Sequence, residues 1–280
     1  MNGSTSTERY IPMTTVKSGQ GKEVAPDIYS FTIQFVNVCF VGTPGQEEGW
    51  VLIDAGTPKS APKIIEEAKE RFGEHAKPRA IVLTHAHFDH IGAIMELIEE
   101  WDVPIYAHTL ELPYLTGEKN YPIPDSSVDA GLIAKLSPMF PTEAIDLGSR
   151  IQALPDDGSI PFMKGWRWIH TPGHTEGHIS LFRDIDRALI VGDAFVTVKQ
   201  ESLYSVLTQQ LDIHGPPKYL TPDWVSSWES VKLLEKLKPL LAITGHGHPV
   251  SGEWLANNLA ILARDFDKMA IPKHGKYLNN

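Results

Sequence analysis

The sequence has a single cysteine, Cys39, among its 280 residues. One thiol excludes an intramolecular disulfide framework and a metal site built from several thiolates, so a bound metal must be held by nitrogen and oxygen ligands. Because Cys39 lies in an apolar run, we expect it to be a small buried hydrophobic residue rather than a nucleophile.

Long apolar runs are also missing. The longest candidates, such as residues 240–244, have the length of a strand, whereas a membrane-spanning helix needs about 20 apolar residues. The first eight residues, MNGSTSTE, have neither the basic start nor the apolar centre of a secretory signal. We therefore expect a cytoplasmic protein without a membrane partner.

Positive charge is in deficit, since 25 Lys and Arg stand against 35 Asp and Glu, a formal net charge of −10 at pH 7. This balance disfavours binding to nucleic acid phosphates or to an anionic membrane. The remaining composition, 42% hydrophobic and 21% charged, is that of an ordinary globular chain. We expect a small-molecule substrate and leave a homodimer open.

Apolar runs rich in β-branched residues predict antiparallel strands over residues 28–41 and 50–53. Helices are predicted over 58–72, 91–100, 224–237 and 252–269. Further strands are predicted over 80–84, 105–107, 166–170, 179–182, 187–191 and 240–244. Residues 110–161 are rich in Pro, Gly, Asp and Ser, which predicts a surface excursion with one short helix near 128–136. We expect a single domain, 1–280, in which this excursion shapes a pocket.

The two halves of the chain repeat one pattern: a strand that ends in an acid beside Gly, a helix, and a strand that ends in histidines. The first copy is VLIDAG at 51–56 with IVLTHAHFDH at 81–90, and the second is ALIVGDA at 188–194 with LLAITGHGHP at 240–249. Strand, crossover helix and strand form a β-α-β unit, whose ligands bind beyond the carboxyl ends of the strands. The pattern predicts an α/β fold, a four-layer αβ/βα sandwich of two packed mixed β-sheets with outer helices.

The run Thr84-His-Ala-His-Phe-Asp-His90 contains four candidate metal ligands: His85, His87, Asp89 and His90. Four ligands within six residues divide more naturally between two ions than they converge on one, and imidazole and carboxylate are ordinary ligands of catalytic zinc. The alternative is a helix cap at Asp89 with solvated histidines, which does not account for three histidines.

Three later positions are weaker signals on their own. His174 and His178 flank a Gly-containing turn after a strand, Asp193 ends a strand, and His246 precedes a second Gly-His pair. Each is more often a turn residue than a ligand. Their joint occurrence at predicted strand ends makes them candidate site residues.

Together these residues resemble the metallo-β-lactamase superfamily of metal hydrolases. The resemblance rests on His-x-His-x-Asp-His at 85–90, and on Gly-His at His174, Gly-Asp at Asp193 and Gly-His at His246, in the family's order. It implies one metal held by His85, His87 and His174, a second held by Asp89, His90 and His246, and Asp193 bridging the pair. It also implies that Asp54 supports the metal loop from behind, with His178 in a supporting or pocket position.

The implied chemistry is hydrolysis by a hydroxide that bridges two divalent ions, most favourably Zn²⁺, with Mn²⁺ or Fe as further options. Asp89 would orient the nucleophile or carry its proton. The bond would be ester-like, as in an ester, lactone, thioester or phosphodiester, because fold and ligands do not choose among these. The alternative is an iron-dependent dioxygenase or persulfide-handling enzyme on the same scaffold.

Substrate contacts are harder to place from the sequence. The lactonases of this family usually carry a tyrosine soon after the bridging acid, whereas here the nearest one after Asp193 is Tyr204, our substrate candidate. The aromatic and histidine side chains that could wall a pocket are Tyr114, Tyr121, Phe195, Tyr204, Trp224 and His214, each with packing as the favoured reading. Lys199 is a candidate anion partner, although a solvated charge is favoured there.

Overall fold

Two β-sheets form from the predicted apolar runs in the computed structural model, which describes residues 13–278. The first sheet has the order β1-β2-β3-β4-β5-β6-β7 and the second the order β12-β11-β10-β9-β8. The strands of the first sheet are β1 Gln20–Ala25, β2 Ile28–Ile33, β3 Val36–Val41, β4 Val51–Ile53, β5 Ala80–Val82, β6 Ile105–Ala107 and β7 Ile151–Ala153. Those of the second are β8 Trp166–His170, β9 Ile179–Arg183, β10 Ala188–Gly192, β11 Leu241–Thr244 and β12 Val250–Ser251.

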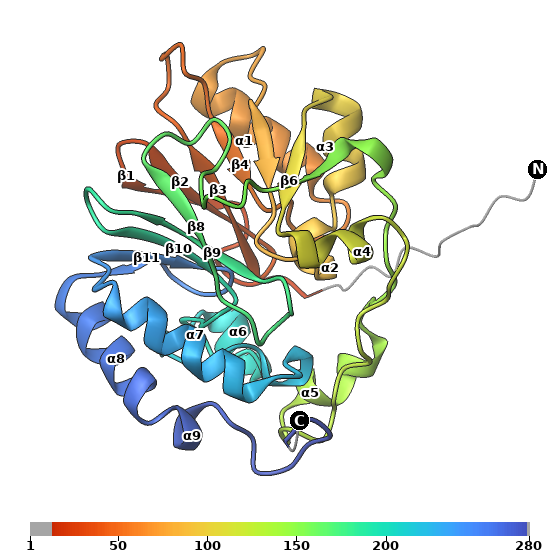
Figure 1. Ribbon diagram of the computed structural model, residues 1–280, viewed down its shortest axis with the longest axis vertical. Helices are drawn as coiled ribbons and strands as arrows, with labels where there is room; N and C mark the ends of the chain where they lie inside the picture. The colour runs from red at the N-terminus through yellow and green to blue at the C-terminus, as the bar shows by residue number, and fades with distance from the viewer. Residues whose placement is uncertain (1–12, 279–280) are drawn as a thin grey trace, which may run out of the picture.

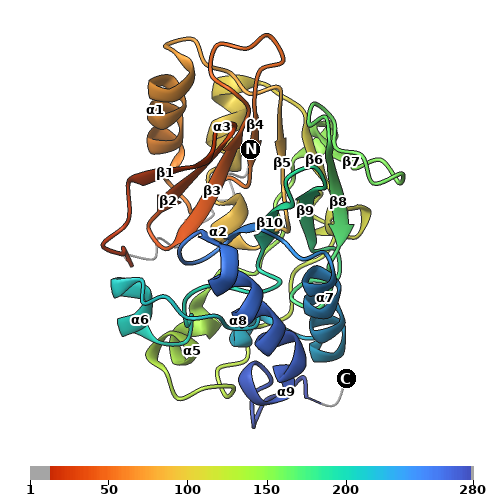
Figure 2. The same cartoon turned by 90° about the vertical axis from the view of Figure 1, so that its left-hand side faces the viewer.

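The two sheets pack face to face, and helices cover their outer faces. The helices are α1 Ala61–Phe72, α2 Phe88–Ile91, α3 Ile94–Trp101, α4 Leu112–Leu115, α5 Leu132–Leu136, α6 Leu203–Thr208, α7 Trp224–Lys236, α8 Gly252–Arg264 and α9 Phe266–Met269. Figure 1 shows α1 and α3 beyond the first sheet and α7 and α8 beyond the second, and Figure 2 shows the same separation after a 90° turn. The predicted four-layer αβ/βα sandwich is confirmed.

Alternate residues of one strand belong to different layers of the core. In β4, Ile53 lies in the cluster between the sheets, with Ile190 of β10, whereas Leu52 packs against the outer helices with Ile64 of α1. A strand buried on both faces needs apolar residues at every position rather than at alternate ones. This requirement explains the nearly continuous apolar run VNVCFV in β3, where all six residues, including Cys39, are buried. The one polar residue, Asn37, donates from its amide to the carbonyls of Thr244 and Gly247.

Both predicted β-α-β units are present. β4 pairs parallel with β5 across α1, and β10 pairs parallel with β11 across a connection that includes α7. The acid that follows β4 and the histidines that follow β5 therefore leave the first sheet at one edge, and the corresponding ends of β10 and β11 leave the second sheet.

Several predicted boundaries differ from the structure. The helix predicted over 91–100 forms as α2 and α3, with a break at Gly92, where an added Cβ would lie 2.2 Å from the nitrogen of Pro58. The predicted helix 252–269 is divided at Asp265 into α8 and α9, and β1 and α6 were not predicted.

Residues 110–161, predicted as a surface excursion, lie partly inside the molecule. They supply β7, which pairs parallel with β6 at the edge of the first sheet, and they bury Glu111, Tyr114 and Leu115. The three residues of β7 are partly or fully exposed, so they carry no apolar pattern that a sequence analysis could use. The part between α4 and α5 runs from the side of the first sheet to the side of the second (Figure 1).

None of the helices within residues 13–278 has the length and apolar character needed to cross a lipid bilayer.

Candidate metal centre

Seven candidate ligands converge from the loops that follow the strands. His85, His87, Asp89 and His90 follow β5 and extend into α2, His174 lies between β8 and β9, Asp193 follows β10, and His246 follows β11. All seven are buried. Side chains separated by up to 161 positions in the sequence are thus collected where the two sheets meet.

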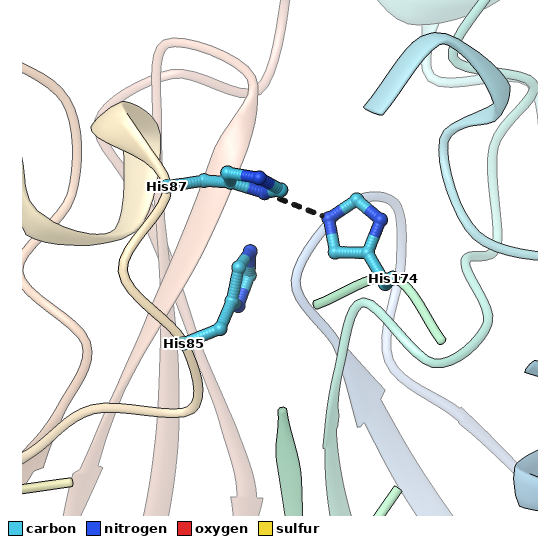
Figure 3. A group of neighbouring side chains, drawn as sticks. All are labelled: His85, His87 and His174. Atoms are coloured by element: carbon cyan, nitrogen blue, oxygen red, sulfur yellow. Dashed lines mark hydrogen bonds between the residues drawn. The ribbon is translucent and has the colours of Figure 1, made fainter. Parts of the chain in front are cut away.

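The first group consists of His85, His87 and His174, whose ligand atoms all lie within 4.8 Å of one another. Figure 3 shows His85 and His87 approaching from one loop and His174 from the opposite one, with their rings turned toward a common point. The Nδ1 atom of His87 lies 2.9 Å from Nε2 of His174.

Hydrogen bonds select the nitrogen that each of these rings presents. The hydroxyl of Thr84 donates to the carboxylate of Asp54, so it accepts from Nδ1 of His85 at 3.1 Å. The hydroxyl of Thr221 donates to the carbonyl of Pro217, so it accepts from Nδ1 of His174 at 3.0 Å. Both rings therefore carry their proton on Nδ1 and direct the lone pair of Nε2 into the group, as metal-ligating histidines do.

The second group consists of Asp89, His90 and His246. Nδ1 of His90 donates to Asp54 at 2.8 Å, and Nδ1 of His246 donates to the carbonyl of Phe35 at 2.8 Å. Each ring again turns Nε2 inward, and Nε2 of His246 lies 3.4 Å from Oδ2 of Asp89.

Asp193 lies between the two groups. Its Oδ2 is 3.5 Å from Nε2 of His174 in the first group and 3.1 Å from Nε2 of His246 in the second, and its Oδ1 is 3.5 Å from Nε2 of His90. Two ligands held about 2.0 to 2.1 Å from a tetrahedral ion lie about 3.3 Å apart, which matches these separations. One carboxylate can therefore reach both positions.

Unpaired polar atoms test whether this cluster suits cations. Nε2 of His85, Nε2 of His90 and Oδ1 of Asp193 are buried and have no hydrogen-bond partner. Because a buried polar atom without a partner costs about 1 to 3 kcal/mol, three of them facing one another call for a shared partner. All three are electron-pair donors, so divalent metal cations fit the donor set.

The electrostatics separate neutral ligands from charged ones. Burial lowers the pKa of His85 and His174 well below the ordinary value, and that of His87 to about 3. Burial would raise the pKa of Asp193, but the neighbouring His246 and His90 hold it well below the ordinary range. Asp193 is therefore the charged member between the two groups, whereas burial raises the pKa of Asp89.

Asp54 and His178 support the cluster from behind. The carboxylate of Asp54 accepts hydrogen bonds from the backbone N–H and hydroxyl of Thr84 and from His90. Its backbone adopts a left-handed φ of 62°, a conformation that a non-glycine residue holds only when its surroundings enforce it. His178 donates from Nδ1 to the carbonyl of Thr171 and accepts at Nε2 from the backbone N–H of Asp193. Because both of its nitrogens are used, His178 positions Asp193 and offers no lone pair to a metal.

Glu111 is a site residue that the sequence analysis missed. It is fully buried, and its carboxylate accepts hydrogen bonds from two loops: from the Ala86 N–H at 3.0 Å and the Tyr121 hydroxyl, and from Thr175 Oγ1 at 2.5 Å and the Gly177 N–H at 3.0 Å. It therefore braces the loop of His85 and His87 against the loop of His174. The one available signal was its position four residues after the end of β6, the strand that pairs with β5.

A cavity of about 330 Å³ opens beside the first group and is bounded by His87 and His174. Of the predicted wall residues, Tyr114 and Tyr121 line it. Phe195 and Trp224 instead lie in the outer core of the second sheet, and His214 lies 2.9 Å from Asp212 and does not border the cavity.

The prediction of Tyr204 as a substrate contact is not supported by its position. Its side chain is 72% exposed and does not border the cavity, because α6 buries Ser205 and Val206 instead. Tyr219, which was not predicted, borders the cavity in its place. Lys199 is partly exposed, and its Nζ lies 3.9 Å from the carboxylate of Asp129.

Comparison with known proteins gives a consistent result. A sequence model described as the metallo-beta-lactamase superfamily matches residues 32–246. The probable metallo-hydrolase YflN of Bacillus subtilis is 52% identical over 254 residues, which cover 91% of this chain and 96% of that protein. The probable metallo-hydrolase YybB of the same organism is 31% identical over 72% of this chain and 83% of its own length.

Solved structures agree on the fold. ST1585 of Sulfolobus tokodaii, described as an archaeal metallo-beta-lactamase superfamily protein, matches with a TM-score of 0.56 and 20% identity over 92% of this chain and 85% of its own. A beta-lactamase from Chitinophaga pinensis matches with a TM-score of 0.60 and 17% identity over 94% and 96%.

Proposed function

The chain belongs to the metallo-beta-lactamase superfamily, and from this premise we propose that it is a binuclear metal-dependent hydrolase that cleaves an ester-like bond. The names of its two Bacillus relatives, both probable metallo-hydrolases, support the hydrolase part of this proposal. The ligand geometry supports the binuclear part.

The observation that carries the proposal is the position of Asp193, within 3.5 Å of a ligand nitrogen in each of the two histidine groups. A single catalytic ion needs three protein ligands and an open position. Here two such sets lie side by side and share a carboxylate, so a second ion has ligands of its own. This arrangement favours a binuclear hydrolase over a dioxygenase with one iron. Imidazole and carboxylate donors favour Zn²⁺, with Mn²⁺ or Fe as the alternatives that metal analysis distinguishes.

When bound, the two cations would supply a water of lowered pKa and would polarise the oxygen of the scissile bond. The chain's own residues hold and orient this chemistry. His85, His87 and His174 would hold one cation, and Asp89, His90 and His246 the other, with Asp193 shared between them. The hydrogen bonds from Thr84 and Thr221 fix the ring orientations, so little reorganisation is needed during the reaction.

Asp89 is the proposed proton carrier. Its Oδ2 faces His246, which leaves the other carboxylate oxygen to accept a proton from the attacking water and pass it to the leaving group. The acyl or phosphoryl part of the substrate would enter through the cavity beside His87 and His174.

The test is metal content together with hydrolysis. We expect the zinc-loaded protein to bind two ions per chain and to hydrolyse at least one member of a panel of a thioester, a lactone, an aryl ester, a phosphodiester and nitrocefin. A chelator and His87→Ala should each abolish turnover. His75→Ala, which changes an exposed histidine outside the cluster, is the matched control and should retain two ions and activity. One iron per chain with substrate-dependent oxygen consumption would overturn the proposal in favour of the dioxygenase.

A further inference from the structure

Flat apolar surfaces form the walls of the cavity beside the first ligand group. The rings of Tyr114 and Tyr121 are stacked, with centroids 3.9 Å apart and an angle of 2° between their planes. Tyr219, Pro122 and Pro222 line the same cavity. The two stacked rings cover one face of each other, so they offer the cavity ring edges and at most one outer face. Together with the pyrrolidine rings of Pro122 and Pro222 they form an apolar surface that suits a ring-bearing apolar group.

The charge of these walls is balanced. Of the described residues that line the cavity, Lys119 and Glu176 carry the full charges, and they form an ion pair in which each side chain is about half exposed. The Tyr114 hydroxyl also donates to Glu176. A substrate anion would have to displace Glu176 from Lys119 and would then face that carboxylate. The walls therefore offer an anion no free positive charge, and they favour an uncharged group.

The outer wall comes from the end of the chain. After α9 the chain turns back toward α5 (Figure 1), and Tyr277 reaches the cavity. The backbone N–H of Lys276 donates to Asp125, and the Tyr277 hydroxyl donates to the carbonyl of Ile123 at 3.1 Å. Because that hydroxyl already donates to the backbone of Ile123, another lining residue, Tyr277 contributes its ring to the cavity wall rather than a free donor.

From these observations we propose that the cavity binds an uncharged, ring-bearing part of the substrate and that Tyr277 is a specificity-determining residue. This inference rests on the proposed hydrolase function and names the class of substrate for it: neutral esters, thioesters or lactones with an aryl or similarly flat substituent. A carboxylate on that substituent is disfavoured at the outer wall, because it would face Glu176 and would find Lys119 already paired.

Hydrolysis of matched esters tests the preference. The substrates are the p-nitrophenyl esters of acetic acid, 3-phenylpropanoic acid and 3-(4-carboxyphenyl)propanoic acid. We expect kcat/KM for the neutral aryl ester to exceed that for each of the others by about tenfold, since one aromatic contact changes an equilibrium by about five- to tenfold. Tyr277→Ala should reduce this preference by about five- to tenfold, whereas Tyr277→Phe, which keeps the ring, should preserve it. Tyr204→Ala removes an exposed tyrosine outside the cavity and should leave the preference unchanged.

A binding measurement separates this inference from the proposed function. Calorimetric titration of the zinc-loaded protein with 3-phenylpropanamide and with its 4-carboxy analogue requires no turnover. Tighter binding of the neutral amide, weakened about five- to tenfold by Tyr277→Ala, supports the inference. It does so even if no ester is cleaved, whereas the lack of cleavage would count against the hydrolase. Turnover of the esters with equal or inverted preference, or equal binding of the two amides, overturns the inference and leaves the hydrolase standing.

Discussion

The brace formed by Glu111 leads to a specific expectation for Glu111→Gln. Oε1 accepts from Thr175 and Gly177, and Oε2 accepts from Ala86 and Tyr121, so every partner of this carboxylate is a donor. An amide keeps the shape of the side chain but replaces one of these oxygens with an NH₂ donor. The substitution therefore changes hydrogen bonding with little change in packing volume.

The magnitude follows from counting the donors. Whichever way the amide turns, a hydroxyl on that side, of Thr175 or Tyr121, can rotate to accept from the NH₂ group. The backbone N–H on the same side cannot accept. That of Gly177 would be left buried without an acceptor at a cost of about 1 to 3 kcal/mol, whereas that of Ala86 would lose one bond but keep the Tyr121 hydroxyl oxygen at 3.1 Å as its acceptor. The amide should therefore direct its NH₂ group toward Tyr121, which costs about 1 kcal/mol for the bond lost from Ala86. Loss of the charge from the remaining bonds adds about 1 kcal/mol, so we expect the free energy of unfolding to fall by about 2 kcal/mol.

The assay is urea unfolding followed by tryptophan fluorescence, together with zinc affinity measured by chelator competition. Because Glu111 holds the loop of His85 and His87 against the loop of His174, zinc affinity should fall by about 10- to 100-fold. Glu176→Gln, which changes a half-exposed ion pair with Lys119, is the control and should cost no more than about 1 kcal/mol. If Glu111→Gln unfolds within about 0.5 kcal/mol of the unmodified protein and binds zinc equally well, the brace has no energetic role.

Two further predictions concern the backbone and the pH dependence of stability. Gly192→Ala should lower the free energy of unfolding in urea by more than about 2 kcal/mol, because φ is 61° and the added Cβ would lie 2.6 Å from Nε2 of His178. Gly148→Ala has a similar φ of 56° with nothing within 4 Å, so it should cost only about 1 kcal/mol, and equal costs would contradict the clash. Burial and the charge of His170 lower the pKa of His108 to about 4. The unfolded chain therefore binds a proton at His108 below about pH 6.5, whereas the folded chain binds it only near pH 4. His108 should therefore titrate near pH 4 by NMR and reduce stability as the pH falls from 6.5 to 4, and a midpoint near 6.5 would show that its surroundings exert no such effect.

The sequence predicted much of the fold because both faces of most strands are buried. Nearly continuous apolar runs marked β3, β5, β10 and β11. The prediction failed where burial gave no pattern: β7 has three partly or fully exposed residues, and α6 is a six-residue helix with two buried positions. The break between α2 and α3 was also missed, because the N–H groups of Gly92 and Ala93 donate to the carbonyls of Gly56 and Ala55, in a segment distant in the sequence.

The candidate ligands could be predicted because each is attached to a strand end and parallel strands expose their carboxyl ends at one edge. Asp54 is located for the same reason. The role of Glu111 could not be predicted, because three of its four donors lie 25 to 66 positions away in the sequence. The choice among the tyrosines failed for the same cause: Tyr204 is closer to Asp193 in sequence than Tyr219, yet Tyr219 is the one that borders the cavity.

By itself, therefore, the sequence determined the sandwich and the strand ends that carry imidazoles and carboxylates, since both follow from local apolar patterns and from the geometry of β-α-β units. Only the tertiary structure decided which nitrogen each histidine presents, which acid braces the two metal loops and which tyrosines form the cavity. These features depend on side-chain directions and on contacts between distant segments, such as Tyr277 with Ile123 across 154 positions, and no local pattern encodes them.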